Sequence, residues 1–348
     1  MKKIAFILGS MGRGGAERVI SILSREYAKR GYQTDIIVLL SNELGYELHS
    51  TTQLIDFSGN TKSRWKRFPY WLKSIRSYVK INKPDVVVSF AARINVLVMT
   101  ACFGLKKKII LSERNDPKCD GRSKLVDILT KIQYKKAYRV IFQTKRACSY
   151  FPKLKNSVII PNPITVACYA NNTNVNKLVN VGRLTKQKNQ EMLIDAFAKI
   201  SKKNRNAFLE IYGSGELENP LKEKIEQYGL IDKVYLMGNV SNIHERIADA
   251  VGFCLSSDYE GLSNALLEAM MMGLPCISTN CAGADEYIID GENGFLVSVG
   301  DKECFSVAMD KLLNDSLVQK QFSTKARECS KVFSLENVIQ QWDDVILK

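Results

Sequence analysis

The stretch VGFCLSSDYEGLSNALLE, residues 251–268, decides the fold of this chain. Residues 251–256 form a short apolar run, which is typical of a buried strand. A polar loop follows, and an apolar run with good helix formers begins near Asn264. A strand, a loop and a helix in this order predict an α/β fold, in which ligands bind at the carboxyl ends of the strands.

Two carboxylates stand out in this stretch, because Glu260 and Glu268 are eight residues apart. Glu260 falls on the loop at the carboxyl end of the predicted strand, and Glu268 falls about two turns into the helix. The free N–H groups and the positive dipole end of the helix can hold a phosphate. Two acids beside such a phosphate seat indicate recognition of hydroxyl groups on a phosphorylated sugar or nucleotide.

Strands and helices alternate over the rest of the chain, which predicts parallel sheets covered on both faces and hence two Rossmann-like domains. Strands are expected at 3–9, 34–40, 85–90, 108–112, 139–144, 157–160, 177–182, 207–212, 233–237, 251–256 and 275–279. Helices are expected at 16–30, 189–199, 217–228, 243–250, 264–272 and 335–347. We place the linker in the asparagine-rich stretch 169–176, and the domains at 1–165 and 166–332, followed by a terminal helical segment, 333–348.

The composition is that of an ordinary globular protein, with 45% apolar and 25% charged residues in 348. No apolar run is as long as a membrane span, and the first strand is too short for a signal peptide, so we expect a cytoplasmic protein. The nine cysteines include no C-x-x-C pair and are expected to be reduced. With only two histidines, a histidine-based metal site is not expected.

The charge is distributed unevenly along the chain. Residues 1–170 contain 31 Lys and Arg against 11 Asp and Glu, whereas residues 171–348 contain 19 against 25. This asymmetry indicates that the first half meets a polyanion or an anionic surface. No zinc-finger or RNP motif is present, so we expect an anionic membrane surface and no nucleic acid.

A segment of the first half, TKSRWKRFPYWLKSIRSYVK at 61–80, interleaves cations with aromatic residues. Basic amphipathic segments with Trp and Phe bind in the headgroup region of anionic membranes. A helix that packs its aromatic residues into the first domain and leaves its cations in water explains the pattern equally well. Both interpretations stay open at this stage.

Two loops of the second half carry cations and glycines at the ends of predicted strands. In NVGRLTKQKN, residues 180–189, Arg183 and Lys188 have the charges that bind a diphosphate, although a solvated basic loop is the simpler reading. In IYGSGEL, residues 211–217, Gly213 begins a turn that lacks the third glycine of a dinucleotide site, so NAD binding is not expected.

Together these motifs resemble family 4 of the retaining glycosyltransferases, which have the GT-B fold. The matching segments, in chain order, are GGAE at 14–17, GRLTKQKN at 182–189, GSGEL at 213–217, LMGNV at 236–240, the two glutamates at 260 and 268, CAGADEYI at 281–288 and DGENGFLV at 290–297. The resemblance implies two Rossmann-like domains that face a central cleft, with the terminal helix crossing back to the N-terminal domain.

The resemblance also implies roles for individual residues. Glu260, Arg183 and Lys188 would act in catalysis, on the donor sugar and its leaving diphosphate. The donor-binding residues would be Gly14, Gly15, Gly213, Met237, Val240, Leu262, Ser263, Asn264, Ala265 and Glu268. Glu268 would accept hydrogen bonds from the ribose hydroxyls. No metal and no other cofactor is expected, since such enzymes work without Mg²⁺ and no D-x-D motif is present.

Polar residues that leave two strands of the first domain are candidates for contacts with the acceptor, although ordinary loop polarity explains each of them as well. They are Arg93, Asn95, Glu113, Arg114 and Asn115. Many relatives carry a histidine in this domain, and neither region has one here, so we assign no catalytic base. If departure and attack share one face of the sugar, the leaving phosphate can take the acceptor's proton.

The resemblance and the charge asymmetry predict a retaining transferase at the inner face of the cytoplasmic membrane. It would move a hexose or N-acetylhexosamine from a nucleotide-diphosphate sugar, with UDP expected, to a polyprenyl-pyrophosphate-linked saccharide for a surface polysaccharide. One alternative is a sugar-nucleotide epimerase with the same fold. The other is a non-catalytic protein that binds membranes or polyanions.

Overall fold

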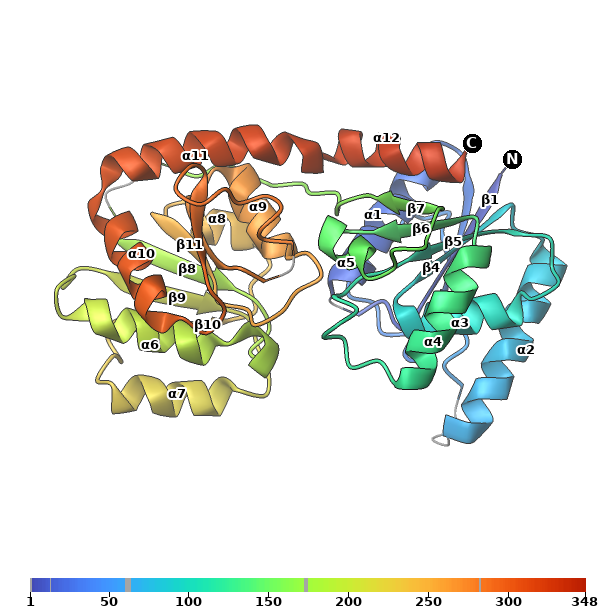
Figure 1. Cartoon of the computed structure of the whole chain (residues 1–348), viewed down its shortest axis with the longest axis horizontal. Coiled ribbons are helices and arrows are strands. Elements are labelled where there is room, and N and C mark those ends of the chain that lie inside the picture. Colours follow the sequence, from blue (N-terminus) through green and yellow to red (C-terminus); the bar gives the residue numbers. More distant parts are fainter. Residues whose placement is uncertain (1, 13, 60–63, 172–174, 282) are drawn as a thin grey trace. The chain divides into compact units, whose positions relative to one another are not determined.

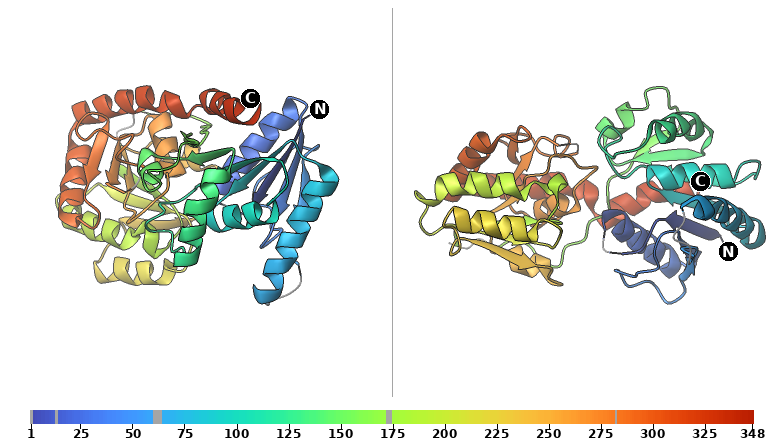
Figure 2. Two further views of the ribbon diagram at one scale, coloured as in Figure 1. Left: turned by 45° about the vertical axis from the view of Figure 1, so that its right-hand side comes forward. Right: turned by 90° about the horizontal axis from the view of Figure 1, so that it is seen from below.

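The structure is a computed structural model that describes residues 2–12, 14–59, 64–171, 175–281 and 283–348, with the backbone alone for residues 64–66. The chain divides into two compact units, each a sheet with helices on both faces (Figures 1 and 2). Unit 1 comprises Met1–Pro163 and Val338–Lys348, and unit 2 comprises Ile164–Asn337. The GT-B class of two parallel-sheet domains is confirmed.

Unit 1 contains, among the described residues, a seven-stranded parallel sheet in the order β3-β2-β1-β4-β5-β6-β7. Its strands are β1 (Lys3–Leu8), β2 (Gln33–Val38), β3 (Gln53–Asp56), β4 (Val86–Phe90), β5 (Lys108–Ser112), β6 (Arg139–Phe142) and β7 (Ser157–Ile159). Its helices are α1 (Gly15–Lys29), α2 (Arg64–Asn82), α3 (Ala92–Ala101), α4 (Lys124–Gln133), η1 (Tyr134–Lys136) and α5 (Lys145–Ser149).

Unit 2 contains, in its described part, a six-stranded parallel sheet in the order β10-β9-β8-β11-β12-β13. Its strands are β8 (Lys177–Val181), β9 (Phe208–Tyr212), β10 (Val234–Gly238), β11 (Gly252–Leu255), β12 (Cys276–Thr279) and β13 (Gly294–Val297). Its helices are η2 (Lys186–Lys188), α6 (Gln190–Ser201), α7 (Glu218–Gln227), α8 (Ile243–Ile247), α9 (Asn264–Met272), α10 (Lys302–Asn314), α11 (Ser316–Ser330) and η3 (Lys331–Phe333), and α12 (Leu335–Ile346) begins here and continues in unit 1.

The strand order reverses once in each sheet, between β1 and β4 in unit 1 and between β8 and β11 in unit 2. In open α/β sheets, the loops on either side of such a switch point run to opposite faces and leave a crevice at the carboxyl ends of the strands. The loop with Arg183 and Lys188 follows β8, and the loop with Glu260 follows β11. The topology of unit 2 therefore brings the two predicted motifs to one switch point.

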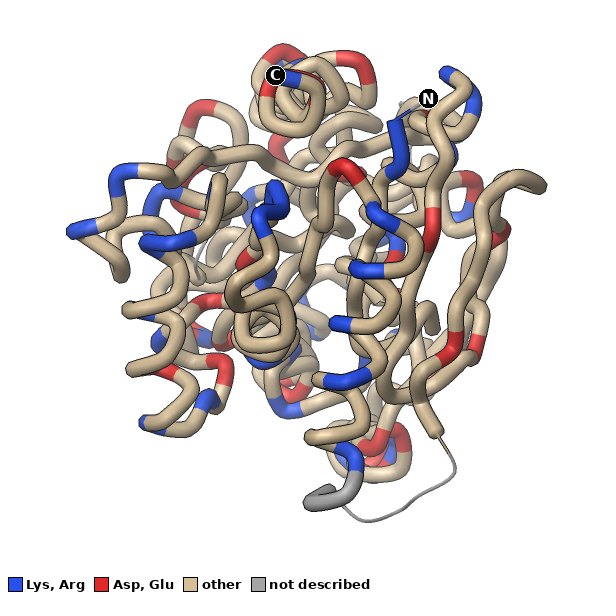
Figure 3. Tube along the Cα trace, turned by 90° about the vertical axis from the view of Figure 1, so that its right-hand side faces the viewer, with Lys and Arg blue, Asp and Glu red and all other residues tan. Residues whose placement is uncertain are grey.

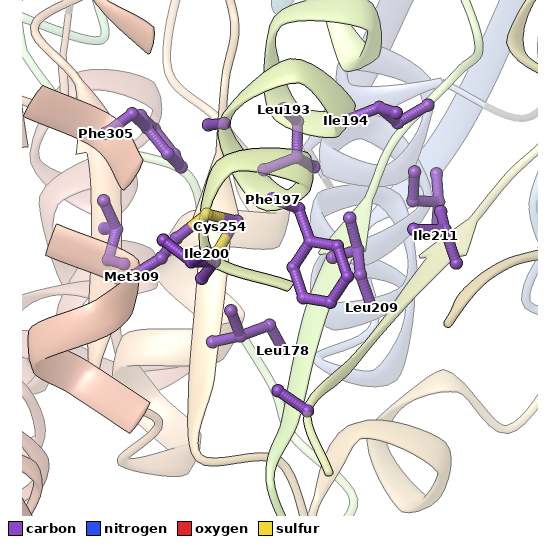
Figure 4. Packing of buried hydrophobic residues seen from close by; sticks show 14 of the residues in the cluster. Leu178, Leu193, Ile194, Phe197, Ile200, Leu209, Ile211, Cys254, Phe305 and Met309 are labelled. Carbon is purple, nitrogen blue, oxygen red and sulfur yellow. The ribbon is translucent and has the colours of Figure 1, made fainter. Parts of the chain in front are cut away.

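Successive residues of the central strands of unit 2 belong to two different cores. Leu178 and Cys254 pack with α6 and α10 in one core, whereas the following Val179 and the preceding Phe253 pack with α9 in the other. Figure 4 shows the first core, with Phe197 of α6 beside Leu209 of β9. Because both faces of these strands are buried, apolar residues follow one another directly, as in Leu178-Val179 and Phe253-Cys254, instead of alternating with polar ones.

The terminal helix α12 packs on unit 1. Trp342 is fully buried and stacks on Phe90, the last residue of β4, with ring centroids 6.2 Å apart and an interplanar angle of 11°. Arg30 donates to Asp343 at 2.7 Å, and Lys108 donates to the carbonyl of Ile346 at 3.1 Å. The expected return of this helix to the N-terminal domain is confirmed.

The chain passes into unit 2 at Ile164, before the linker predicted at 169–176. Ile164 pairs with Ser334 and is buried with Phe333, so it is part of unit 2. Ala170 is also bonded into this unit, because its N–H donates to the carbonyl of Met272 at 2.8 Å. Residues 172–174 of the predicted linker lie outside the described residues, as do Arg13, just before the GGAE motif, and Ala282 and residues 61–63 of the quoted motifs.

Candidate active site

The two loops that follow β8 and β11 are held together by backbone and side-chain hydrogen bonds. The N–H of Asp258 donates to the carbonyl of Gln187 at 2.9 Å, and the Gln187 side chain donates to the carbonyl of Tyr259 at 2.9 Å. Ser256 Oγ donates to the carbonyl of Lys188 at 2.8 Å. Residues 72 positions apart in sequence are thus fixed side by side at the switch point.

An ion pair joins the two predicted motifs, because Lys188 Nζ contacts Glu260 Oε1. The lysine side chain is 15% exposed and the glutamate side chain 9%, so both charges are largely removed from water. Ser257 Oγ donates to the same carboxylate oxygen at 2.8 Å. Separating the two side chains would leave each charge buried without its partner, which is strongly destabilising. Each group therefore fixes the position of the other.

Arg183 lies on the same loop and is exposed. No hydrogen bond or ion pair holds its guanidinium within the part of the chain that the structure describes. The loop rests against the glycine turn after β9, where a Cβ on Gly213 (φ 134°) would lie 2.0 Å from the carbonyl oxygen of Gly182. A Cβ on Gly215 would lie 2.3 Å from the carbonyl oxygen of Leu184. The two glycines therefore set the path of the cationic loop.

Helix α9 begins at the other side of the Glu260 loop. Ser263 is its N-cap, and the Ser263 hydroxyl accepts from the N–H of Leu266 at 3.4 Å. The first N–H groups of any helix have no partner within it, so the backbone of 263–265 presents the positive end of α9. The side chain of Leu262 is buried with Leu267 and anchors this end of the helix.

Glu268 lies in the second turn of α9 and is 6% exposed. Its Oε2 is 3.1 Å from Nε2 of His244, which lies on α8. The other ring nitrogen of His244, Nδ1, accepts from the backbone N–H of Ala167 at 3.1 Å. No motif in the sequence predicted this contact, because His244 and Glu268 are 24 positions apart and lie on different helices.

Two of the predicted donor-binding residues, Met237 and Val240, lie at the end of β10 and just beyond it. Met237 is 38% exposed, and Val240 is half-buried against the core that contains α9. The carbonyl of Gly238 accepts from the N–H of Gly213 at 2.8 Å, and Asn239 donates to Ser214 Oγ at 2.7 Å. These bonds connect the LMGNV segment to the glycine turn.

The chain matches the model of Glycosyltransferase Family 4 over residues 13–167 and the model of Glycosyl transferases group 1 over residues 167–329. It is 30% identical to an uncharacterized glycosyltransferase of Methanocaldococcus jannaschii, over 78% of this chain and 80% of that protein. The chain belongs to glycosyltransferase family 4.

Two further proteins are informative for this glycosyltransferase. The first is a Campylobacter jejuni enzyme, a GalNAc-alpha-(1->4)-GalNAc-alpha-(1->3)-diNAcBac-PP-undecaprenol alpha-1,4-N-acetyl-D-galactosaminyltransferase. It is 28% identical over 98% of this chain and 97% of its own length. The second is Anabaena HepE, crystallised with UDP, which superimposes with a TM-score of 0.85 at 18% identity over the full length of both chains.

In unit 1 of the glycosyltransferase, Gly14 and Gly15 form the junction between the loop after β1 and helix α1. Gly14 is the N-cap in an extended conformation, and its carbonyl accepts from the Tyr46 hydroxyl at 3.1 Å. A Cβ on Gly14 would lie 2.2 Å from the Glu17 carboxylate, a side chain that can move. A contact of this loop with a donor stays a prediction.

The predicted acceptor residues Asn95 and Glu113 are buried in one network of unit 1. Tyr134 donates to Glu113 at 2.8 Å and accepts from the Asn95 amide at 3.0 Å. Arg122 pairs with Glu113 at 3.1 Å. Burial raises the pKa of Glu113 to about 7, while the Arg122 charge opposes this shift. Both predicted residues thus face protein groups, and a direct contact of either with an acceptor stays a prediction.

The other three predicted acceptor residues make different contacts. Arg114 donates to the Asn162 side chain at 2.8 Å, and its guanidinium lies 4.3 Å from the ring centroid of Phe90. Burial lowers the pKa of Arg114 to about 9. Asn115 accepts from the next backbone N–H at 3.0 Å, and the exposed Arg93 donates to the carbonyl of Gly121 at 3.0 Å. Their contact with an acceptor also stays a prediction.

Proposed function

We propose that this glycosyltransferase moves a hexose or N-acetylhexosamine from a UDP-sugar to a polyprenyl-diphosphate-linked saccharide, with retention of configuration. It would act as a peripheral protein on the inner face of the cytoplasmic membrane, in the synthesis of a surface glycan. The name of the Campylobacter relative supports this class of acceptor, and the UDP complex of HepE supports the base. The ion pair of Lys188 with Glu260 beside the N-terminus of α9 carries the proposal.

The proposed donor site neutralises a departing diphosphate with the protein's own groups. Arg183 can bind two phosphate oxygens as a fork, and Lys188 supplies a point charge. The N-terminus of α9 adds backbone N–H donors. We therefore propose that no metal and no other cofactor takes part in the transfer. Full activity after treatment with EDTA would agree with this, and loss of activity that Mg²⁺ restores would contradict it.

The transfer itself exchanges one bond at the anomeric carbon for another. The bond from this carbon to the diphosphate oxygen breaks, and a bond to the acceptor hydroxyl oxygen forms on the same face of the sugar. The hydroxyl proton passes to the leaving phosphate. Charges fixed in advance around the leaving group stabilise this transition state more than the bound substrate, and this difference accelerates the reaction. Glu260 would face the sugar, and Glu268 would accept from the ribose hydroxyls.

Thermal unfolding with UDP, GDP and ADP tests the donor site directly. A ligand that binds only the folded protein raises its stability by about 2.7 kcal/mol at one hundred times its Kd. We expect UDP to raise the melting temperature at millimolar concentration, with smaller shifts for GDP and ADP. If no nucleotide changes the melting temperature of the parent protein, the proposed donor site is wrong. Release of an epimerised sugar nucleotide without any acceptor would favour the epimerase alternative.

The proposed membrane association draws on the charge of unit 1. Figure 3 shows many more Lys and Arg than Asp and Glu on the face of unit 1 that it presents, including along α2. The structure describes no helix long and apolar enough to span a membrane. Within α2, however, Ile75 and Val79 are buried and Trp71 donates to the carbonyl of Phe57 at 2.9 Å. Much of the apolar side of this helix is therefore used in the core of unit 1.

Helix α4 carries a row of apolar side chains that are largely exposed. Leu125, Ile128 and Ile132, here called the α4 ridge, are 65%, 55% and 51% exposed and recur at helical spacing. Phe103, which follows α3, is 74% exposed, and Lys136 Nζ lies 6.0 Å from the centroid of its ring. An apolar ridge with lysines nearby fits the interface of an anionic bilayer. We therefore propose the α4 ridge, more than α2, as the part that enters the membrane surface.

Substitution of the α4 ridge tests this surface. The triple change Leu125→Ser, Ile128→Ser and Ile132→Ser should weaken binding to phosphatidylglycerol vesicles by about tenfold or more, since burying one such side chain contributes about 1.5–3 kcal/mol. Vesicle sedimentation measures the affinity.

Unit 2 provides a matched control for the ridge. Val307 and Leu317 are apolar and 67% and 79% exposed, so the double change Val307→Ser and Leu317→Ser should leave vesicle binding unchanged. Equal binding by the parent and the ridge variant would show that the ridge does not enter the bilayer.

A further inference from the structure

The contacts of His244 determine which of its ring nitrogens carries the proton. A backbone N–H can only donate, so Nδ1 must accept from the N–H of Ala167 at 3.1 Å. The ring proton is therefore on Nε2, which faces Oε2 of Glu268 at 3.1 Å. His244 thus donates a hydrogen bond to the carboxylate of Glu268.

This hydrogen bond restricts a side chain that would otherwise be mobile. Glu268 has three rotatable bonds, and fixing one of its oxygens restricts both the rotamer and the plane of the carboxylate. The side chains of His244 and Glu268 are only 13% and 7% exposed, so water competes weakly for the bond. Ala167 in turn follows Val166, which packs against the cluster that includes Leu267 of α9. The imidazole is therefore held from both sides.

We propose that His244 is a positioning residue for the donor, because it orients Glu268 to accept hydrogen bonds from the ribose hydroxyls of the nucleotide. The inference rests on the proposed function, in which Glu268 contacts the ribose. A carboxylate that is oriented before binding loses less entropy when the nucleotide arrives, so the affinity for the nucleotide is higher.

Two conservative substitutions separate this role from a merely structural one. In His244→Gln, the amide nitrogen occupies the place of Nε2 and keeps the bond to Glu268. In His244→Asn, the amide oxygen occupies the place of Nδ1 and keeps the bond from Ala167. A positioning role predicts that Gln preserves binding and Asn does not, whereas a structural role at Ala167 predicts the opposite order. His244→Phe keeps the ring and removes both bonds.

The experiment is calorimetric titration of each variant with UDP and with 2′,3′-dideoxy-UDP, which lacks the ribose hydroxyls. We expect His244→Phe and His244→Asn to weaken UDP binding by about tenfold, as expected when a residue that orients a ligand-binding group is lost. His244→Gln should stay within about threefold of the parent, since it keeps the charge-assisted bond. All variants should bind the dideoxy analogue as the parent does.

Other results would overturn the inference in distinguishable ways. If Glu268→Ala weakens UDP binding but His244→Phe does not, the positioning role is wrong and the proposed function stands. Equal losses for UDP and the dideoxy analogue in His244→Phe would also overturn it, because the ribose would not be involved. If Glu268→Ala binds UDP like the parent, the ribose contact in the proposed function is wrong, and this inference fails with it.

Discussion

Replacing Lys188 with alanine should lower kcat/KM by about 10²–10³, the usual effect of removing one preorganised group that stabilises a developing negative charge. Lys188 is held beside Glu260, on the loop that leads into the N-terminus of α9, so its ammonium is already in place when the diphosphate departs. The loss should fall mainly on kcat, because the charge on the leaving group is greatest in the transition state. Steady-state transfer to a lipid-linked saccharide measures both parameters.

A control variant and a second substitution sharpen this experiment. Lys186 is exposed on the same loop, so Lys186→Ala should stay within about twofold of the parent, as most surface substitutions do. Lys188→Ala also leaves Glu260 buried without its cation, which should lower the free energy of unfolding by about 3 kcal/mol. Adding Glu260→Gln should recover much of this stability but no activity.

Activity of Lys188→Ala within twofold of the parent would contradict the proposed donor site. If Lys188→Ala loses activity and the double variant with Glu260→Gln regains it, the single change affected folding alone. The two readouts, melting temperature and kcat/KM, thus separate the electrostatic role of Lys188 from its role in holding the loops together.

Local signals allowed some elements to be predicted closely. Helix α9 was predicted at 264–272 and is found at Asn264–Met272. Its start is marked by Ser263, which caps the helix, and its end by Gly273, which adopts a left-handed conformation with φ 83°. Both signals are local, so the sequence alone carries them.

Helix α3 shows why other elements could not be predicted. Seven of its ten residues are apolar, and Val96, Leu97 and Val98 are consecutive and buried. Without a polar face, the 3.6-residue period disappears and a helix cannot be told from a buried strand. The helix also begins after Ala91, which has a φ of 75°. A positive φ is uncommon for alanine, so the sequence does not predict this start.

The candidate site was predictable where one strand and its loop carry the motif, as for Lys188 and Glu260. The contacts that orient other predicted residues, Asn95 and Glu268, come from distant parts of the chain. Asn95 donates a hydrogen bond to Tyr134, which is 39 positions away in the sequence. Glu268 is hydrogen-bonded to His244, which lies on another helix. Such contacts depend on how helices pack on the sheet, and no spacing within one motif encodes them.

The second large effect concerns the stability of unit 1. Trp342→Ala should lower its free energy of unfolding by about 3–5 kcal/mol, because the change leaves a cavity against Phe90 in a close-packed core. For a unit of this size, each kcal/mol corresponds to about 2–4 °C in melting temperature, so calorimetry should resolve the shift.

Trp342→Phe should cost much less, since it keeps a ring on Phe90 and removes an indole N–H that has no hydrogen-bond partner among the described residues. Gln340 is exposed on the same helix, so Gln340→Ala should have almost no effect. Equal melting temperatures for Trp342→Ala and Gln340→Ala would mean that α12 contributes little to the stability of unit 1.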